Sequence, residues 1–499
     1  MKFKKRDVNH SDNNFLSKQR IFYACMLSIL IIESFMLIYE KSNAAPDGLQ
    51  GMYVYEDSEH GGPIEYVYQY PPISNLDASS GVMILAHGCS HSALDFWPKF
   101  DLTCPKCKGL PIEKSIVLES LSRDYIVVAI SSLDTKTRCW DTSSKSLDLK
   151  RVEHAIENIR NKINLPTNIP NFIIGASSGG MFASPLAIHL NEQAKGKIAD
   201  TGTKITPRPH LEVTAINVQI STIPRSLWKR TYIDETLLPS IHFVHMSRDN
   251  RLKNNILDFL EKSSLYDNTI IIDNEKLKLE SIDYNHDGIP DKGVPIPDNN
   301  EDDDNAWYNE YIKQLKQKDG KLKSLSTITI DKWSSSSSQS KLLYKAATTS
   351  ANAKLLNKVK GSNDNDNDFV NNVIVMMRSM ASPIKITPEF LVYRTYGVLP
   401  SYRIANHLID AFKVAGIIDE KTGLLTNDPR AANNNWRDIV MKSIPDAIKH
   451  ENDNLLPDQS ALSEILNVAY AQHEFTDEFL SQTLDFFDEL SPFNTDEDW

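Results

Sequence analysis

Ser177 lies at the centre of a G-x-S-x-G pattern formed with glycines at 175 and 179. The pattern directly follows Phe172–Ile174, a short, partly β-branched apolar segment of the kind that ends a buried strand. A serine on a sharp turn from a strand into a helix is exposed for attack on a carbonyl carbon, and small flanking residues avoid collisions with the neighbouring backbone. The pattern therefore predicts nucleophilic acyl-transfer chemistry at Ser177. A structural turn rich in glycine and serine is the alternative interpretation.

A serine nucleophile on such a turn is followed along the chain by an acid and then by a histidine. The acid is expected just after the second strand beyond the nucleophile strand. That strand is expected to end at Met246, and Asp249 is the only carboxylate before the helix expected over 251–262. The other position considered, 221–224, contains no carboxylate. Asp249 is therefore the predicted acid, although an aspartate here would also suit the N-cap of the helix.

The histidine must come after Asp249, and four candidates remain: His286, His407, His450 and His473. The first lies in an acidic loop, the second in a helix with ordinary core periodicity, and the third at a polar helix end. His473 precedes the last amphipathic helix, where the catalytic histidine loop is expected. We predict that His473 accepts the Ser177 proton while Asp249 orients the imidazole. A buried histidine that caps a helix is the alternative.

An oxyanion formed during acyl transfer needs backbone N–H donors. The N–H of Ser178, the residue after the nucleophile, is one predicted donor. The second is the N–H of Cys89, in the turn that follows the apolar strand ending before His87-Gly88. Cys89 is not predicted to be a nucleophile itself, because no histidine–acid pair is reserved for it.

Strand-like and helix-like segments alternate through the first half of the chain. Continuous apolar runs predict buried strands, and apolar residues at helical spacing predict an amphipathic helix over 147–163. Two aromatic-rich edge strands joined at Gly61-Gly62 come first, and the strands expected after them are 82–86, 125–130, 172–174, 213–220, 241–246 and 269–272. This order indicates βαβ units in an α/β fold with a mostly parallel central sheet flanked by helices.

The predicted core, residues 46–273, is interrupted by an acidic, Ser/Asn-rich insertion at 274–368 that is expected to be largely disordered. A helical, lid-like segment is expected at 369–465. The histidine loop and the final helix of the core follow at 466–490. The two parts of the core would therefore be separated by a long insertion.

Within the insertion, oxygen-bearing side chains have the spacing of a calcium loop around a glycine at 288: Asp283, Asn285, Asp287 and Asp291. Val294 occupies the position at which a true EF-hand carries a bidentate glutamate. A calcium site and a solvated acidic loop are therefore both open interpretations. The predicted acyl-transfer chemistry itself requires no cofactor.

A basic leader, residues 1–20, precedes an apolar run at residues 21–39 that is long enough to span a bilayer as a helix. The excess of lysine and arginine before the run places the N-terminus in the cytosol. The rest of the chain would then be luminal or extracellular, in a single-pass type II membrane protein with an uncleaved signal-anchor. Because Ser42-Asn43-Ala44 resembles a cleavage site, secretion after signal cleavage is the alternative.

The cysteines beyond the apolar run would all lie in an oxidising compartment: Cys89, Cys104, Cys107 and Cys139. Four cysteines allow two disulfides in three connectivities. The Cys104–Cys107 spacing would also suit the first half of a zinc site, which is the alternative. The formal net charge of −12 disfavours nucleic acid as a partner. An acyl or other small-molecule substrate and the membrane are the predicted partners, and the sequence indicates no particular oligomeric state.

The chain contains the short motifs HGC at 87–89, CPKCKGLP at 104–111, RCW at 138–140, GASSGG at 175–180, HMSRD at 245–249 and YAQHE at 470–474. Together they resemble a group of largely uncharacterised α/β-hydrolase-superfamily proteins of plants and algae, over roughly residues 80–265 and 380–490. The resemblance implies an α/β-hydrolase fold with Ser177, Asp249 and His473 as its triad. It implies no substrate.

Two functional hypotheses follow. In the first, the chain is a membrane-anchored serine hydrolase that cleaves a carboxylic ester or a related acyl bond. In the second, it is a catalytically inactive α/β-hydrolase-fold protein that serves in binding or adhesion, because a fold alone does not confer activity. The ordered presence of all three triad positions favours the first hypothesis.

Overall fold

The computed structural model describes residues 48–57, 61–72, 76–196, 204–227, 237–263, 269–278, 327–331, 374–395, 399, 401–445, 455 and 459–491. Chain contacts divide the protein into units 1–50 and 51–499, and the description below concerns the second. The predicted membrane segment at 21–39 and the predicted calcium loop at 283–291 lie outside the described residues. In the part of the chain that is described, none of the helices has the length and apolar character needed to cross a bilayer.

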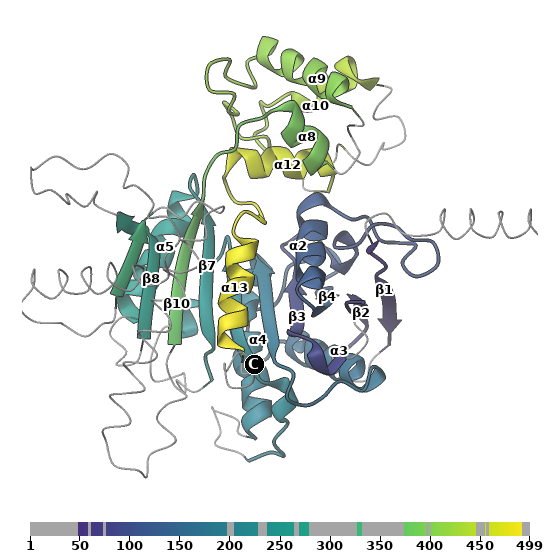
Figure 1. Cartoon of the computed structure of the whole chain (residues 1–499), viewed down its shortest axis with the longest axis vertical. Coiled ribbons are helices and arrows are strands. Elements are labelled where there is room, and N and C mark those ends of the chain that lie inside the picture. The colour runs from purple at the N-terminus through teal and green to yellow at the C-terminus, as the bar shows by residue number, and fades with distance from the viewer. Residues whose placement is uncertain are drawn as a thin grey trace, which may run out of the picture. The chain divides into compact units, whose positions relative to one another are not determined.

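A ten-stranded sheet of described residues has the order β1-β2-β4-β3-β5-β6-β7-β10-β8-β9 (Figure 1). Strand β2 is antiparallel to β1 and β4, and the other neighbouring pairs are parallel. The strands are β1 (Met52–Glu56), β2 (Ile64–Gln69), β3 (Gly81–Ala86), β4 (Tyr125–Ile130), β5 (Asn171–Ala176), β6 (Val213–Gln219), β7 (Ser240–Met246), β8 (Thr269–Lys278), β9 (Thr327–Asp331) and β10 (Ile374–Ala381). With helices packed against it, this is a mixed, mostly parallel sheet of an α/β fold.

The central strands consist of apolar runs because they are covered on both faces. Every residue of β3, β4 and β5 is buried, whereas β1, at the sheet edge, is only partly covered. A strand with one solvated face would instead alternate apolar and polar residues. The runs that predict the inner strands therefore also indicate which strands lie in the middle of the sheet.

Helices pack along the sheet in two contacting pairs. Helix α2 (Pro111–Ser122) contacts α13 (Leu480–Leu490), and these helices also contact β4 and β6, respectively. Helix α3 (Leu147–Lys162) contacts α4 (Ser178–Lys195), which packs on β5 and β6. Helix α5 (Asn250–Ser263) packs on β7. The sequentially last helix thus lies beside the first helix of the core.

A group of short helices lies beyond one end of the sheet (Figure 1). It comprises α8 (Pro388–Arg394), α9 (Tyr402–Val414), α10 (Trp436–Ser443) and α12 (Ala461–Tyr470). Serine side chains cap α9 and α12 by accepting hydrogen bonds from backbone N–H groups, and Thr387 does the same for α8. Helices α8 and α10 both contact α9, and α12 contacts α2 of the core. We call these four helices, together with the described residues between α9 and α10, the cap.

Residues 374–381 differ from the sequence-based assignment. They fall in the segment expected to be helical and lid-like, but they form β10, which lies between β7 and β8 in the sheet. The run begins with apolar residues that suit a buried strand, yet Arg378 and Ser379 interrupt it. Both polar side chains are buried, where Arg378 Nη1 lies 2.9 Å from His245 Nε2 and Ser379 Oγ lies 3.0 Å from His242 Nε2. These polar partners make the interrupted run compatible with the core.

The four cysteines form two disulfides, Cys89–Cys139 and Cys104–Cys107. This pairing leaves none of the four thiolates for the zinc alternative. The first disulfide joins the turn after β3 to the loop after β4, two parallel neighbours in the sheet. The second closes a small ring just before α2.

The two disulfides should differ in their contribution to stability. The sequence separations are 50 residues for Cys89–Cys139 and 3 for Cys104–Cys107, and a cross-link restricts the unfolded chain more when it closes a longer loop. We expect the Cys89→Ser/Cys139→Ser variant to lose about 2 kcal/mol more free energy of unfolding than the Cys104→Ser/Cys107→Ser variant. Denaturant unfolding of both variants measures this difference. Equal losses would contradict the prediction.

Candidate active site

Ser177 occupies the turn between β5 and α4. Its φ of 52° and ψ of −114° are unfavourable for a residue with a side chain, so the turn holds the serine in a strained conformation. The turn is fixed on both sides: the Ser177 N–H donates to the Gln219 carbonyl at 2.9 Å, and the Met181 N–H donates to the Ser177 carbonyl at 2.9 Å. The sequence pattern thus corresponds to a strand–turn–helix unit with the serine at its apex.

The two glycines of the pattern are required by close backbone contacts. A Cβ at Gly175 would lie 2.4 Å from the Gly179 carbonyl oxygen, and a Cβ at Gly179 would lie 2.2 Å from the Ala86 carbonyl oxygen. No side chain fits at such distances. The absence of a Cβ therefore lets the start of α4 approach both β5 and β3.

The three residues predicted to act together are joined by hydrogen bonds. Ser177 Oγ lies 3.0 Å from His473 Nε2, and His473 Nδ1 lies 2.9 Å from Asp249 Oδ2. These contacts connect residues separated by 296 and 224 positions along the chain. A nucleophile, a base and an orienting acid would need this arrangement.

Asp249 makes the contacts that each of its two sequence-based interpretations would require. Its Oδ2 faces His473, while its Oδ1 accepts a hydrogen bond from the Leu252 N–H at 3.0 Å, in the first turn of α5. Burial alone would raise the pKa of Asp249, but the hydrogen bonds from His473 and Leu252 outweigh it and lower the pKa below its ordinary value. The carboxylate is therefore held in its ionised form beside the imidazole.

His473 lies on the loop between α12 and α13, and residues far away in sequence hold that loop. The Arg248 N–H donates to the Ala471 carbonyl at 3.0 Å. This hydrogen bond joins the histidine loop to the turn after β7 that carries Asp249, which we call the acid loop. Arg430, from the cap, donates through Nη1 to the His473 carbonyl at 2.9 Å and also pairs with Glu474. Sequence reasoning missed Arg430, because no local pattern connects it to a loop more than 40 residues later.

The loop after β3 carries Cys89, one of the two predicted oxyanion donors. His87 anchors this loop: its Nδ1 lies 2.7 Å from the Gly88 carbonyl oxygen, and its Nε2 lies 3.1 Å from the Ser132 N. Burial lowers the pKa of His87 to about 4, so it is neutral near pH 7, donating from Nδ1 and accepting at Nε2. Trp140 donates to the His87 carbonyl at 2.9 Å. Ser178, the other predicted donor, is the first residue of α4.

A cavity of about 320 Å³ opens beside Ser177. Its wall includes the Cys89 loop and the His473 loop, and many of its other side chains are polar or charged. Ile220 and Phe475 are the large apolar side chains among its described lining residues. The cavity can therefore accept a small ligand that makes several polar contacts.

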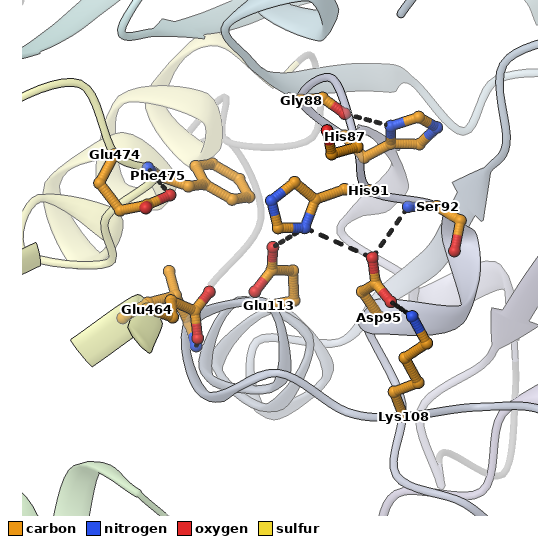
Figure 2. Close-up of polar contacts among 12 residues, drawn as sticks. His87, Gly88, His91, Ser92, Asp95, Lys108, Glu113, Glu464, Glu474 and Phe475 are labelled. Carbon is orange, nitrogen blue, oxygen red and sulfur yellow. Dashed lines mark hydrogen bonds and ion pairs between the residues drawn. The ribbon is translucent and has the colours of Figure 1, made fainter. Parts of the chain in front are cut away.

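His91, which the sequence analysis did not single out, lies on the cavity wall within a buried charged cluster (Figure 2). Its Nδ1 lies 3.4 Å from Asp95 Oδ2 and 3.7 Å from Glu113 Oε1. Lys108 Nζ lies 3.7 Å from Asp95 Oδ1. Burial would lower the pKa of His91, but its contact with the Asp95 carboxylate and the charges of Asp95 and Glu113 together raise it to about 9. His91 is therefore an imidazolium at neutral pH.

A second part of the cluster joins the cap to the core. Glu464, on α12, accepts a hydrogen bond from the Ile112 N–H at 3.2 Å, in the first turn of α2. Glu464 and Glu113 are both buried and interact electrostatically, and burial is the largest cause of the raised pKa of each. Burial and the nearness of two carboxylates both disfavour the ionised form. The contact between α12 and α2 is therefore favoured when these carboxyl groups are protonated.

The predicted metal-binding residues lie outside the part of the chain that the structure describes. Within the described ranges, no group of three or more metal-ligating side chains is found. The calcium loop stays a prediction.

We expect Glu464→Gln to reduce the pH dependence of stability. An acid whose pKa is raised by folding makes the folded protein bind more protons than the unfolded chain, so the free energy of unfolding falls as pH rises above the unfolded value. Glutamine keeps an acceptor for Ile112 and offers an N–H to Glu113 without ionising. Melting temperatures between about pH 5 and about pH 9 should decline less in the variant. Glu420→Gln, at an exposed cap position, is the control; parallel curves for wild type and Glu464→Gln would show the prediction to be wrong.

No protein-family model matches the chain, and no curated protein matches it. Solved structures give distant likenesses. An α/β serine hydrolase without a lid from Xanthomonas campestris is 11% identical with a TM-score of 0.26, over 42% of this chain and 78% of that one. An esterase from Pyrococcus furiosus is 12% identical with a TM-score of 0.27, over 43% and 79%. A feruloyl esterase module from Clostridium thermocellum is 9% identical with a TM-score of 0.31, over 45% and 76%.

Proposed function

We propose that this chain is a serine hydrolase that cleaves a carboxylic ester or a related acyl bond. The hydrogen-bonded series Ser177–His473–Asp249 is the observation that carries the proposal. A structural turn, a helix cap and a capping histidine would each explain one of these residues. They would not explain why all three side chains meet beside a cavity.

The proposed reaction begins with proton transfer from Ser177 Oγ to His473 Nε2 as the oxygen attacks the carbonyl carbon of the substrate. The carbonyl oxygen becomes an oxyanion, for which the N–H groups of Cys89 and Ser178 are the proposed donors. The ionised Asp249 stabilises the imidazolium through Nδ1. The imidazolium then gives its proton to the leaving alcohol, and an acyl group remains on Ser177.

Deacylation repeats the sequence with water as the nucleophile. His473 takes a proton from the water as its oxygen attacks the acyl carbon, and it returns a proton to Ser177 Oγ when the acid leaves. Each proton taken by His473 is thus given back, and the enzyme is restored. The strained turn keeps Oγ in place through both halves of the cycle.

A fluorophosphonate probe tests the proposal, because it reacts covalently with activated serines. We expect the wild type and the control Ser122→Ala, which changes an exposed serine at the end of α2, to be labelled. Ser177→Ala should not be labelled.

With an ester substrate, Ser177→Ala and His473→Ala should each lose on the order of 10⁴-fold or more in kcat. The double variant should lose little beyond this, because the residues act as a unit. Asp249→Asn should lose somewhat less. Wild-type protein that is folded but neither labelled nor active would favour the inactive binding protein.

We also propose that residues 21–39 anchor the hydrolase as a single-pass type II membrane protein. The charge asymmetry around this segment in the sequence supports the proposal. Protease added to the cytosolic side of sealed membranes should leave the C-terminal part intact. Digestion of that part would contradict the topology, and recovery of the protein free of membranes would favour signal cleavage.

A further inference from the structure

His91 and Ser177 both lie close to Gly88, in the turn that follows β3. A Cβ built on Gly88 would be 3.6 Å from Ser177 Cβ and 3.9 Å from His91 Cδ2, so both side chains adjoin the same point. His91 and Glu113 also line the cavity that contains Ser177 and His473. Neither residue takes part in the proposed triad, yet both would lie near a substrate bound to it.

The orientation of the His91 ring determines what it offers to a ligand. Nδ1 faces the carboxylates of Asp95 and Glu113, and the ring extends from its backbone toward Phe475 and Glu474 (Figure 2). The other ring nitrogen, Nε2, lies on the side of those two cavity-lining residues. Because the pKa of His91 is raised to about 9, Nε2 carries a proton at neutral pH and can donate it in a hydrogen bond.

Several charged side chains around the cavity already have partners within the protein. His91 is paired with Asp95, Arg430 is paired with Glu474, and Asp428 accepts a hydrogen bond from the Arg430 N–H. Burial raises the pKa of Glu113, which favours its uncharged form. A charged ligand would have to compete with these pairs, and an alkyl chain would cover polar groups without offering them hydrogen bonds. A hydroxyl group both donates and accepts, so it can bind a donor and an acceptor that lie side by side.

We propose that His91 and Glu113 form a hydroxyl-binding subsite, with His91 Nε2–H as donor and the Glu113 carboxyl as acceptor. The substrate class that fits is a short ester with a free hydroxyl group near the scissile bond. A cavity of about 320 Å³ is at the small end for ligand pockets and suits a compact substrate. This assignment of substrate class rests on the proposed hydrolase function, whereas the hydroxyl-binding subsite itself does not.

Matched esters test the subsite and locate the hydroxyl group. Glycerol monoacetate is compared with propyl acetate for a hydroxyl in the alcohol, and methyl glycolate with methyl propionate for a hydroxyl in the acyl group. In each pair the ratio of kcat/KM is taken, so a partly unfolded preparation affects both members equally. We expect His91→Leu to lower the ratio in at least one pair by about tenfold or more, because a charge-assisted hydrogen bond is lost.

Further variants separate binding from packing. His91→Gln retains an N–H donor and should keep more of the preference than His91→Leu. Glu113→Leu removes the acceptor and should also lower the ratio, whereas Glu113→Gln keeps an acceptor oxygen and should retain more of it. His154→Gln, a partly exposed histidine on α3 away from the cavity, should leave the ratio unchanged. Ratios in His91→Leu that equal those of wild type in both pairs would overturn the subsite.

A binding measurement distinguishes failure of the subsite from failure of the hydrolase proposal. Glycerol and 1-propanol are compared as ligands of Ser177→Ala by saturation-transfer NMR. We expect a signal for glycerol that is lost in Ser177→Ala/His91→Leu. If the wild type cleaves no ester but glycerol binds in this His91-dependent way, the hydrolase proposal fails and the subsite stands. If esters are cleaved but glycerol binding does not depend on His91, the subsite fails alone.

Discussion

The close approach of α4 to β3 and β5 is the constraint on which the rest of the site depends. At Gly179 the helix backbone lies so near the Ala86 carbonyl that no side chain fits, and this contact fixes the start of the helix against the sheet. Ser177 is consequently held in a backbone conformation that it would rarely adopt alone. The same contact brings the turn after β3, with Cys89, to the nucleophile. One steric requirement therefore positions two parts of the proposed machinery.

The His473 loop, the third part of the proposed machinery, reaches the site because the chain re-enters the sheet as β10. Strand β10 inserts beside β7, and the chain then passes through the cap before the His473 loop meets the acid loop. Two polar contacts lie at this junction: Arg430 donates to the His473 carbonyl, and Glu464 accepts from the Ile112 N–H in the first turn of α2. The Glu464 oxygen thereby satisfies one of the backbone N–H groups that a helix N-terminus leaves unpaired. The cap is thus joined to the core where the proposed chemistry occurs.

Local patterns predicted the parts of the site that are themselves local. The turn at Ser177 follows from glycines and a strand within a few residues, and Asp249 was found by elimination at a strand end. The roles of Arg430, His91 and Glu464 depend on contacts between distant segments, which no spacing reveals. The disulfide connectivity was open for the same reason. Once β3 and β4 are known to be parallel neighbours, the loops that follow them lie at one edge, and Cys89 can meet Cys139. Strand β10 was missed because Arg378 and Ser379, which interrupt its apolar run, find hydrogen-bond partners on β7, far away in sequence.

The three histidines near the site, His87, His91 and His473, differ in their burial and in the groups that contact them. His87 is buried without a carboxylate in hydrogen-bond contact, so its pKa falls to about 4 and it serves as a neutral link between backbone groups. His91 is almost as buried but faces two carboxylates, so its pKa rises to about 9 and it presents a cation. His473 is more exposed and faces one carboxylate and one hydroxyl. The proposed base thus has a hydroxyl at one ring nitrogen and a carboxylate at the other, which is the arrangement that proton transfer from a serine requires.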